Sequence, residues 1–181
     1  MSLQLITPPA TEPVALADAK AHLKIDTPDE DALLATLITA ARARAEWHTG
    51  RAFVAQSWIL RLDAWPYDGV AEIPLPPLQA VSEVAVHTNN GLRTALPSDA
   101  YWVDKASEPG RLILNDPPPD LRSRDCLEIA FTAGFGAAVP AALREAILQI
   151  VADLYTHRGE ENGTVGLTGQ ALLAPYRIFK L

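Results

Sequence analysis

One apolar stripe constrains this chain more than any other feature, because a second element must cover it. The stretch Val139–Arg158, VPAALREAILQIVADLYTHR, repeats its large apolar side chains every three or four residues, which places them on one face of a helix. Pro140 suits the first helical turn, and Gly159 suits the C-cap. The stripe consists of Leu143, Ile147, Ile150, Val151 and Leu154. A helix with such a face needs apolar partners elsewhere in the chain.

A second helix with a matching face is predicted from Thr27 to Thr49. Thr27, Pro28 and Glu30 follow the capping-box pattern, with Glu three residues after the Thr N-cap. Gly50 suits the C-cap. The buried face is expected to hold Leu33, Leu34, Leu37, Ile38, Ala41 and Ala45, with His48 in the same sector. We therefore expect the two long helices to form one core.

After Gly50 the apolar period changes from 3.6 to 2, which is typical of strands. Turn signals separate the strand-like runs. Asn90-Gly91 is the most specific of these signals, because a tight hairpin needs residues that tolerate positive φ. Strands are expected at 53–63, 71–75, 81–88, 92–96, 101–104, 111–114 and 126–132. This block is predicted to be a mostly antiparallel β-rich insertion between helices.

The predicted fold class is α+β. It combines a helical bundle of three main helices, the β-rich insertion and an extended C-terminal tail. The third helix is a shorter one over residues 14–25, VALADAKAHLKI, which follows a proline-punctuated, extended opening segment. The predicted organisation is a helical body at 1–52 and 133–162, an insertion at 53–132 and a flexible docking tail at 163–181.

Composition excludes several classes of protein. The net charge of −7 argues against a protein that grips nucleic acid through its phosphates. No apolar run approaches the roughly 20 residues of a membrane span, and the first residues lack the order of a signal peptide, so we expect synthesis in a cytoplasm. The single cysteine, Cys126, lies in a strand-like run and is expected to be a buried, unreactive thiol.

No motif for catalysis or metal binding stands out. The histidines are His22, His48, His87 and His157. They are scattered and form no H-x-x-x-H or H-E-x-x-H frame, and C-x-x-C is also absent. We therefore predict no catalytic, metal-binding or cofactor-binding residue and interpret His48 as structural. Arg42 and Trp47 point away from the apolar stripe of their helix and are our candidates for contacts between subunits.

The C-terminal segment is unusually apolar. Glycines at 163, 166 and 169 argue against a long helix, and QALLAPYRIFKL follows them. Residues 164–181 carry two basic residues and no acid, whereas residues 1–163 carry 13 basic and 22 acidic residues. Such a segment is not expected to remain in water. Either it folds back onto its own helices, or it docks into another protein with Arg177 and Lys180 meeting acidic groups.

Four blocks of the chain are informative when they are taken in order: ALADAKAHLKI, DEDALLATLITAARARAEWHTGR, FTAGFGAAVPAALREAILQIVADLYTHRGE and LLAPYRIFKL. Together they comprise 74 of the 181 residues. In this order they resemble the head-tail connector (adaptor) proteins of long-tailed bacteriophages and of gene transfer agents. The β-rich block between them is the part that matches least.

The resemblance implies a structural protein that is made in the bacterial cytoplasm and located in the neck of a particle. It implies a ring of twelve copies that links the portal protein to a stopper or tail-completion protein. Double-stranded DNA would pass through the ring without specific binding. The portal-binding tail would comprise Leu172, Leu173, Pro175, Tyr176, Arg177 and Phe179. The alternatives are a small enzyme or nucleic-acid-processing factor with a cleft between the helices and the β-rich insertion, and a protein-interaction module unrelated to viruses.

Overall fold

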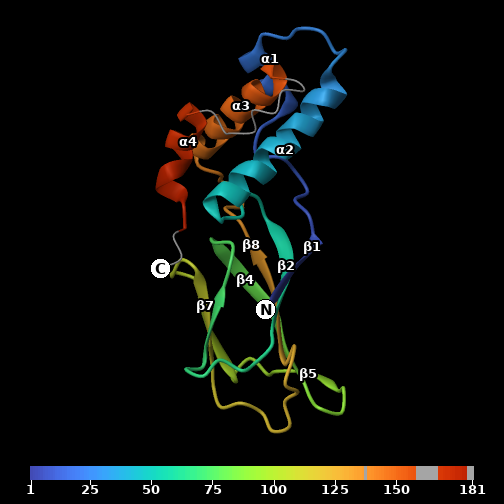
Figure 1. The fold of residues 1–181 in the computed structure, drawn as a ribbon, viewed down its shortest axis with the longest axis vertical. Helices are drawn as coiled ribbons and strands as arrows, with labels where there is room; N and C mark the ends of the chain where they lie inside the picture. Colours follow the sequence, from blue (N-terminus) through green and yellow to red (C-terminus); the bar gives the residue numbers. More distant parts are fainter. Residues whose placement is uncertain (137, 158–166, 179–181) are drawn as a thin grey trace. The chain divides into compact units, whose positions relative to one another are not determined.

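A computed structural model of the chain describes residues 1–136, 138–157 and 167–178. The chain divides into two compact units, whose elements are labelled in Figure 1. The β unit joins Met1–Ala10 to Ala55–Gly136, and the helical unit joins Thr11–Val54 to Ala137–Leu181. The predicted combination of helices with antiparallel sheets is confirmed. The predicted bundle of three helices is not confirmed, because the described residues contain a fourth helix.

The β unit holds a five-stranded sheet in the order β1-β2-β8-β4-β5 and a three-stranded sheet in the order β3-β7-β6. Neighbouring strands in both sheets are antiparallel. The strands are β1 (Ser2–Thr7), β2 (Gln56–Leu62), β3 (Val70–Ile73), β4 (Leu78–His87), β5 (Arg93–Ala95), β6 (Tyr101–Asp104), β7 (Gly110–Leu114) and β8 (Leu127–Ala133). The central strand β8 is almost entirely buried, whereas β7 alternates between buried and exposed side chains. All seven predicted strands are present, and β1 is an addition.

The predicted hairpin at Asn90-Gly91 joins β4 to β5. Gly91 has the positive φ that the pattern requires, at +83°. Asn90 acts differently from the prediction, because its side-chain oxygen accepts a hydrogen bond from the Leu92 N–H at 3.3 Å. The Thr88 N–H closes the loop by donating to the Leu92 carbonyl oxygen at 3.0 Å. The turn is therefore wider than a two-residue hairpin.

The first ten residues were wrongly predicted to belong to the helical body. Strand β1 pairs with β2 at the edge of the large sheet, from Ser2 opposite Arg61 to Thr7 opposite Ser57. The amino group of Met1 forms an ion pair with Asp63 at 2.6 Å. The pairing joins segments more than 50 residues apart and has no turn between them, so no local signal indicated it.

The helical unit contains α1 (Leu16–Leu23), α2 (Asp31–Thr49), α3 (Ala141–Thr156), α4 (Leu167–Leu173) and the 3₁₀ turn η1 (Ala174–Tyr176). Helices α2 and α3 pack against each other. The buried residues of α3 include four of the five predicted stripe residues, and Leu154 is half-buried. In α2 the buried apolar residues are Leu34, Ile38, Ala41 and Ala45, while Leu33 is exposed. Among the described residues, no helix is long and apolar enough to cross a membrane.

The first residue of helix α2 is Asp31, three residues later than the predicted first helical residue, Pro28. The Glu30 carboxylate does not cap the helix, because it accepts a hydrogen bond from the Tyr155 hydroxyl at the far end of the sequence. The Asp31 N–H donates to the Pro28 carbonyl oxygen at 3.1 Å, which makes residues 28–31 a turn. At the other end, Gly50 takes the predicted left-handed C-cap conformation, with φ +71°.

Helix α3 also begins later than predicted. Pro140 is its N-cap and not a residue of its first turn. The last helical residue is Thr156, and the predicted C-cap at Gly159 lies outside the described residues.

Candidate functional site

The C-terminal segment of the described chain, residues 167–178, is folded onto the helical unit. Leu173, the last residue of α4, has no exposed surface. Beyond η1, the Tyr176 carbonyl oxygen accepts a hydrogen bond from Nε of Arg51 at 2.6 Å, and the Ile178 N–H donates to the Thr49 carbonyl oxygen at 2.9 Å. The prediction of an extended tail is therefore wrong for these residues.

The end of helix α2 provides the place where this segment binds. Gly50 turns the chain out of the helix, and a Cβ added to that glycine would lie 3.7 Å from Cβ of Ile178. The helix leaves its last carbonyl groups without intrahelical partners, and the Thr49 carbonyl oxygen accepts from the segment instead. Arg51 follows the cap directly and is itself buried, with 8% of its surface exposed. The C-terminal end of α2 and residues 176–178 therefore provide hydrogen-bond partners for each other's backbone groups.

The predicted portal-binding residues do not share one exposed surface. Pro175 and Arg177 are exposed, Leu172 and Tyr176 are half-buried, and Leu173 is in the core. Phe179 lies outside the described residues. A partner that approaches the segment as it is folded here can therefore reach Pro175 and Arg177 but not Leu173.

The two predicted subunit-contact residues have different environments. Trp47 is 85% exposed, as predicted for a residue outside the apolar stripe. Arg42 is buried, with only 8% exposed, so the prediction that it points outward is wrong. Its Nε contacts Glu12 at 2.7 Å and its Nη1 contacts Glu46 at 2.6 Å. Burial alone would lower the pKa of Arg42, but the hydrogen bonds and charges of these two carboxylates raise it above its usual value.

His48 lies beside the C-terminal segment and is half-buried. Burial lowers its pKa, and the positive charges of Arg177 and Arg44 lower it further. The ring therefore senses the charge of Arg177. Among residues 1–136, 138–157 and 167–178, no group of three His, Cys, Asp or Glu side chains could hold a metal ion.

A cluster of charged side chains lies on the large sheet around Glu128 of β8, which is 7% exposed. Arg61 of β2 contacts one carboxylate oxygen at 3.0 Å, and Arg93 of β5 contacts the other at 3.0 Å. Arg93 also reaches Glu83 of β4 at 2.7 Å. Burial would raise the pKa of Glu128, but the two arginines lower it below its usual value. The cluster ties four strands together by charge.

Cys126 is buried, with 1% of its surface exposed, as predicted. Burial raises the pKa of its thiol, which lowers the fraction of reactive thiolate.

A family model described as "Phage gp6-like head-tail connector protein" matches residues 13–99. The whole fold resembles a chain in the neck of an empty gene transfer agent particle computed with C6 symmetry, at a TM-score of 0.84 and 26% identity, covering 100% of this chain and 97% of that one. Over residues 13–99 the chain is similar to phage head-tail connectors. The resemblance predicted from the sequence is confirmed.

Two further structures contain chains similar to this one. One is the virion of a native gene transfer agent particle, at a TM-score of 0.84 and 25% identity, and the other is the neck of a native particle computed with C12 symmetry, at a TM-score of 0.81 and 26% identity. In both cases the match covers 100% of this chain and 97% of the other chain. No curated protein sequence matches this chain. The family and these neighbours are structural neck proteins, so an enzyme is not favoured.

The sequence did not identify Arg51 and Glu128 as important residues of this chain. Arg51 follows a C-cap glycine, where a basic residue is unremarkable. Glu128 could have been identified from the sequence more easily than Arg51, because it is a charged residue in the middle of the apolar run CLEIAF. A charge in a central strand usually has an opposite charge beside it.

Proposed function

We propose that this chain is a structural connector in the neck of a phage or gene transfer agent particle. Copies of it would form a ring that links the portal protein to a stopper or tail-completion protein. The observation that carries the proposal is the match of the entire chain to chains of gene transfer agent necks, at TM-scores of 0.81 to 0.84. A match to one shared domain would be a weaker argument, because one fold supports many functions.

We propose twelve copies in the ring, and the C12 symmetry of one similar neck supports this number. A closed ring uses two different surfaces of each subunit. Trp47 is the candidate for one of them, because an indole that is 85% exposed on a long helix is costly in water and typical of interfaces. Arg42 is not a candidate, since its charge is already paired inside the subunit.

The portal contact is proposed to lie in the C-terminal segment. Pro175 and Arg177 are exposed in the folded segment, next to half-buried Leu172 and Tyr176. Leu173 could take part only after the segment leaves the helical unit. Phe179 completes the predicted set beyond the described residues. The contact would join an apolar surface to a positive charge, and so fits a portal groove that is apolar with acidic residues at its rim.

Double-stranded DNA is proposed to pass through the ring without being bound. With a net charge of −7, the chain offers phosphates little overall attraction. Low affinity suits a channel through which DNA has to slide.

Electron microscopy of the purified chain mixed with its portal protein tests the proposal. The expected result is a ring of twelve copies stacked on the portal. The variant Arg177→Glu should reduce binding to the portal, whereas Arg144→Glu makes the same charge change at an exposed position of α3 and should not. Portal that remains bare at concentrations where both proteins are folded would refute the connector role.

A further inference from the structure

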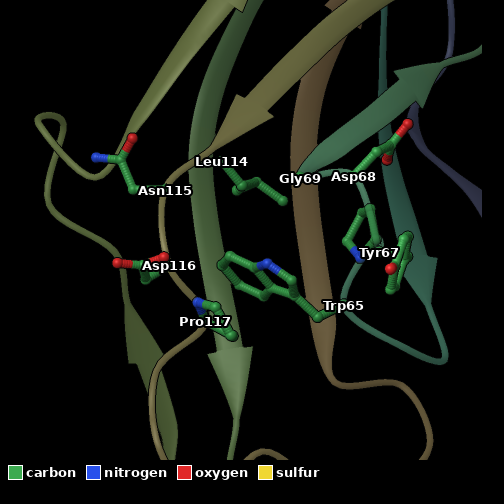
Figure 2. A pocket seen from close by; sticks show the side chains of 9 residues that line it. Trp65, Tyr67, Asp68, Gly69, Leu114, Asn115, Asp116 and Pro117 are labelled. Carbon is green, nitrogen blue, oxygen red and sulfur yellow. The ribbon is translucent and has the colours of Figure 1, made fainter.

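The β unit contains a hollow of about 820 Å³ that the connector role does not explain. Two loops line it. Residues 65–69 precede β3, and residues 114–117 comprise the last residue of β7 and the three residues that follow it. Figure 2 shows the indole of Trp65 between the loops, with Leu114 and Pro117 beside it. Tyr67 and Asp68 lie to one side of the indole, and Asn115 and Asp116 lie to the other. The hollow therefore has an aromatic centre and a carboxylate on each side.

Backbone hydrogen bonds fix the two loops against each other. The Leu114 N–H donates to the Gly69 carbonyl oxygen at 2.7 Å, and the Gly69 N–H donates to the Pro66 carbonyl oxygen at 3.1 Å. Gly69 has φ +70°, and a Cβ at this position would lie 2.9 Å from the Leu114 carbonyl oxygen. Only glycine allows this close approach. The hollow is thus preorganised, which lowers the entropic cost of binding.

Side-chain hydrogen bonds fix the rims of the hollow. Oδ1 of Asp68 accepts from the Val70 N–H at 3.1 Å. On the other rim, Nδ2 of Asn115 donates to the Asp99 carbonyl oxygen at 3.0 Å. The carboxylates of Asp68 and Asp116 are both solvent-exposed. The Asp68 carboxylate is therefore held at its rim, and both carboxylates are accessible to a ligand.

The chemistry of the hollow selects for a positive charge. Tyr67 is fully exposed and Trp65 is half-buried, and exposed aromatic clusters with a polar rim are typical of interaction sites. The residues of the β unit, 1–10 and 55–136, include six basic and eleven acidic side chains, a net charge of −5. Their field favours cationic ligands and disfavours nucleic acid and acidic partners.

We propose that the hollow is a docking site for an arginine side chain on an exposed loop of a different protein. A planar guanidinium can stack on the Trp65 indole, where the negative charges of Asp68 on one side and Asp116 on the other both attract it. The β unit of a second copy is a poorer occupant of this hollow, because it carries the same excess of acidic side chains as the surface around the hollow. Contacts between copies through other surfaces are not affected. This inference goes beyond the connector role and does not depend on it.

The test is a titration of the ¹⁵N-labelled full chain, followed through the indole N–H resonance of Trp65. The probe is the peptide acetyl-Gly-Arg-Gly-amide. Its matched control carries citrulline, which keeps the shape of arginine but lacks the charge. The arginine peptide should shift the Trp65 resonance to saturation, and the citrulline peptide should bind at least roughly fivefold more weakly.

A pair of double variants adds a second comparison. Asp68→Asn with Asp116→Asn should weaken binding of the arginine peptide by roughly fivefold, and asparagine at 68 keeps the oxygen that accepts from Val70. Asp26→Asn with Asp29→Asn removes the same charge from exposed positions of the helical unit and should leave the affinity unchanged.

Three outcomes would overturn the proposal. They are no saturable shift at Trp65, equal affinity for the two peptides, or full affinity in the Asp68/Asp116 variant. A Trp65 resonance that moves with protein concentration alone would show that a second copy occupies the hollow, and a different protein would then be the wrong occupant. The titration contains no portal protein and no ring, so its failure would leave the connector proposal untouched.

Discussion

Replacing Leu173 with alanine tests whether the C-terminal segment is an independent docking element or a part of the core. Leu173 has no exposed surface, and Leu→Ala at such positions costs about 2–5 kcal/mol. Besides this side chain, the described contacts of the segment include the hydrogen bonds from Arg51 to Tyr176 and from Ile178 to Thr49. Since a hydrogen bond contributes about 1 kcal/mol, Leu173 is expected to supply most of the energy that holds the segment down.

Hydrogen exchange measured by NMR is the assay, because it reports local opening separately from global unfolding. The amide of Ile178, which is bonded to Thr49, should lose protection in Leu173→Ala. For a local loss of about 2–4 kcal/mol, the exchange rate rises by about 30- to 1,000-fold. Amides in the middle of α3 should keep their protection. Leu172→Ala is the matched control, because Leu172 is adjacent and only half-buried, and its effect should be smaller.

A uniform loss of protection across α2, α3 and residues 167–178 would refute this reasoning. That result would mean that the segment unfolds only together with the helical unit. Docking by release of the segment would then require partial unfolding of the helical unit.

Three further predictions concern charged groups and Trp47. Glu128→Gln should lower the free energy of unfolding at pH 7 by about 2–3 kcal/mol. This loss is smaller than for a fully buried ion pair, because the side chains of Arg61 and Arg93 are 30% and 41% exposed. The native pKa of Glu128 is lowered, so its contribution is present above the unfolded pKa of about 4.3 and lost as pH falls through the native value. Urea unfolding should show a smaller difference in the free energy of unfolding between the native chain and Glu128→Gln at pH 3 than at pH 7. An equal difference at both pH values would contradict the stabilising role assigned to the Glu128 carboxylate. The NMR titration midpoint of His48 should rise in Arg177→Gln, because the Arg177 charge lowers the pKa of His48; an unchanged midpoint would mean that the two side chains are apart in solution. With its pKa lowered in the native state, His48 makes the protein more stable as pH rises from the native value to the unfolded value of about 6.5. Arg42→Met should lower the melting temperature by an amount equivalent to about 1–3 kcal/mol, because it leaves Glu12 and Glu46 without their shared cation. Trp47→Ala should leave the melting temperature unchanged and reduce ring formation on the portal. If instead Trp47→Ala lowered the melting temperature and Arg42→Met reduced ring formation, the roles assigned to these two residues would be exchanged.

The parts of the fold that follow from local periodicity could be predicted from the sequence. The stripe of α3, the C-cap at Gly50 and all seven strands between residues 53 and 133 depend on neighbours a few positions away. Strand β1 depends on pairing with β2, more than 50 residues later. The start of α2 depends on Tyr155, which binds the carboxylate that the capping-box pattern assigned to the helix end. Local patterns therefore predicted the elements but not the contacts that decide their ends.

The candidate site was harder to predict because its residues depend on distant partners. The position of Arg42 on the helix suggested an exposed charge, yet Glu12, thirty residues earlier, makes its burial tolerable. The apolar composition of the C-terminal segment was consistent with folding back and with docking. Its composition could not reveal that Thr49 and Arg51 accept and donate the hydrogen bonds that place residues 174–178 on the end of α2.

If the proposed portal contact is correct, the fold-back of this segment leaves two ways of docking, and Arg51→Gln can separate them. Arg51 holds the Tyr176 carbonyl but is not among the side chains proposed to meet the portal. If docking requires release of Leu173, the helical unit competes with the portal for the segment. The apparent affinity for the portal is then the intrinsic affinity multiplied by the fraction of molecules in which the segment is released. Arg51→Gln removes the hydrogen bond to Tyr176, and weakening the attachment of the segment by about 1–2 kcal/mol would then increase the affinity for the portal by about 5- to 30-fold. If the portal recognises the segment as it is folded here, the same change weakens binding, because the portal must order a looser surface.

Arg144→Gln serves as the control for Arg51→Gln, since it makes the same chemical change at an exposed position of α3. Equal portal affinities for the native chain and both variants, measured by surface plasmon resonance, would place the portal contact outside residues 167–178. The sign of the Arg51 effect thus decides whether the packing of Leu173 opposes the proposed portal contact or builds the surface that makes it.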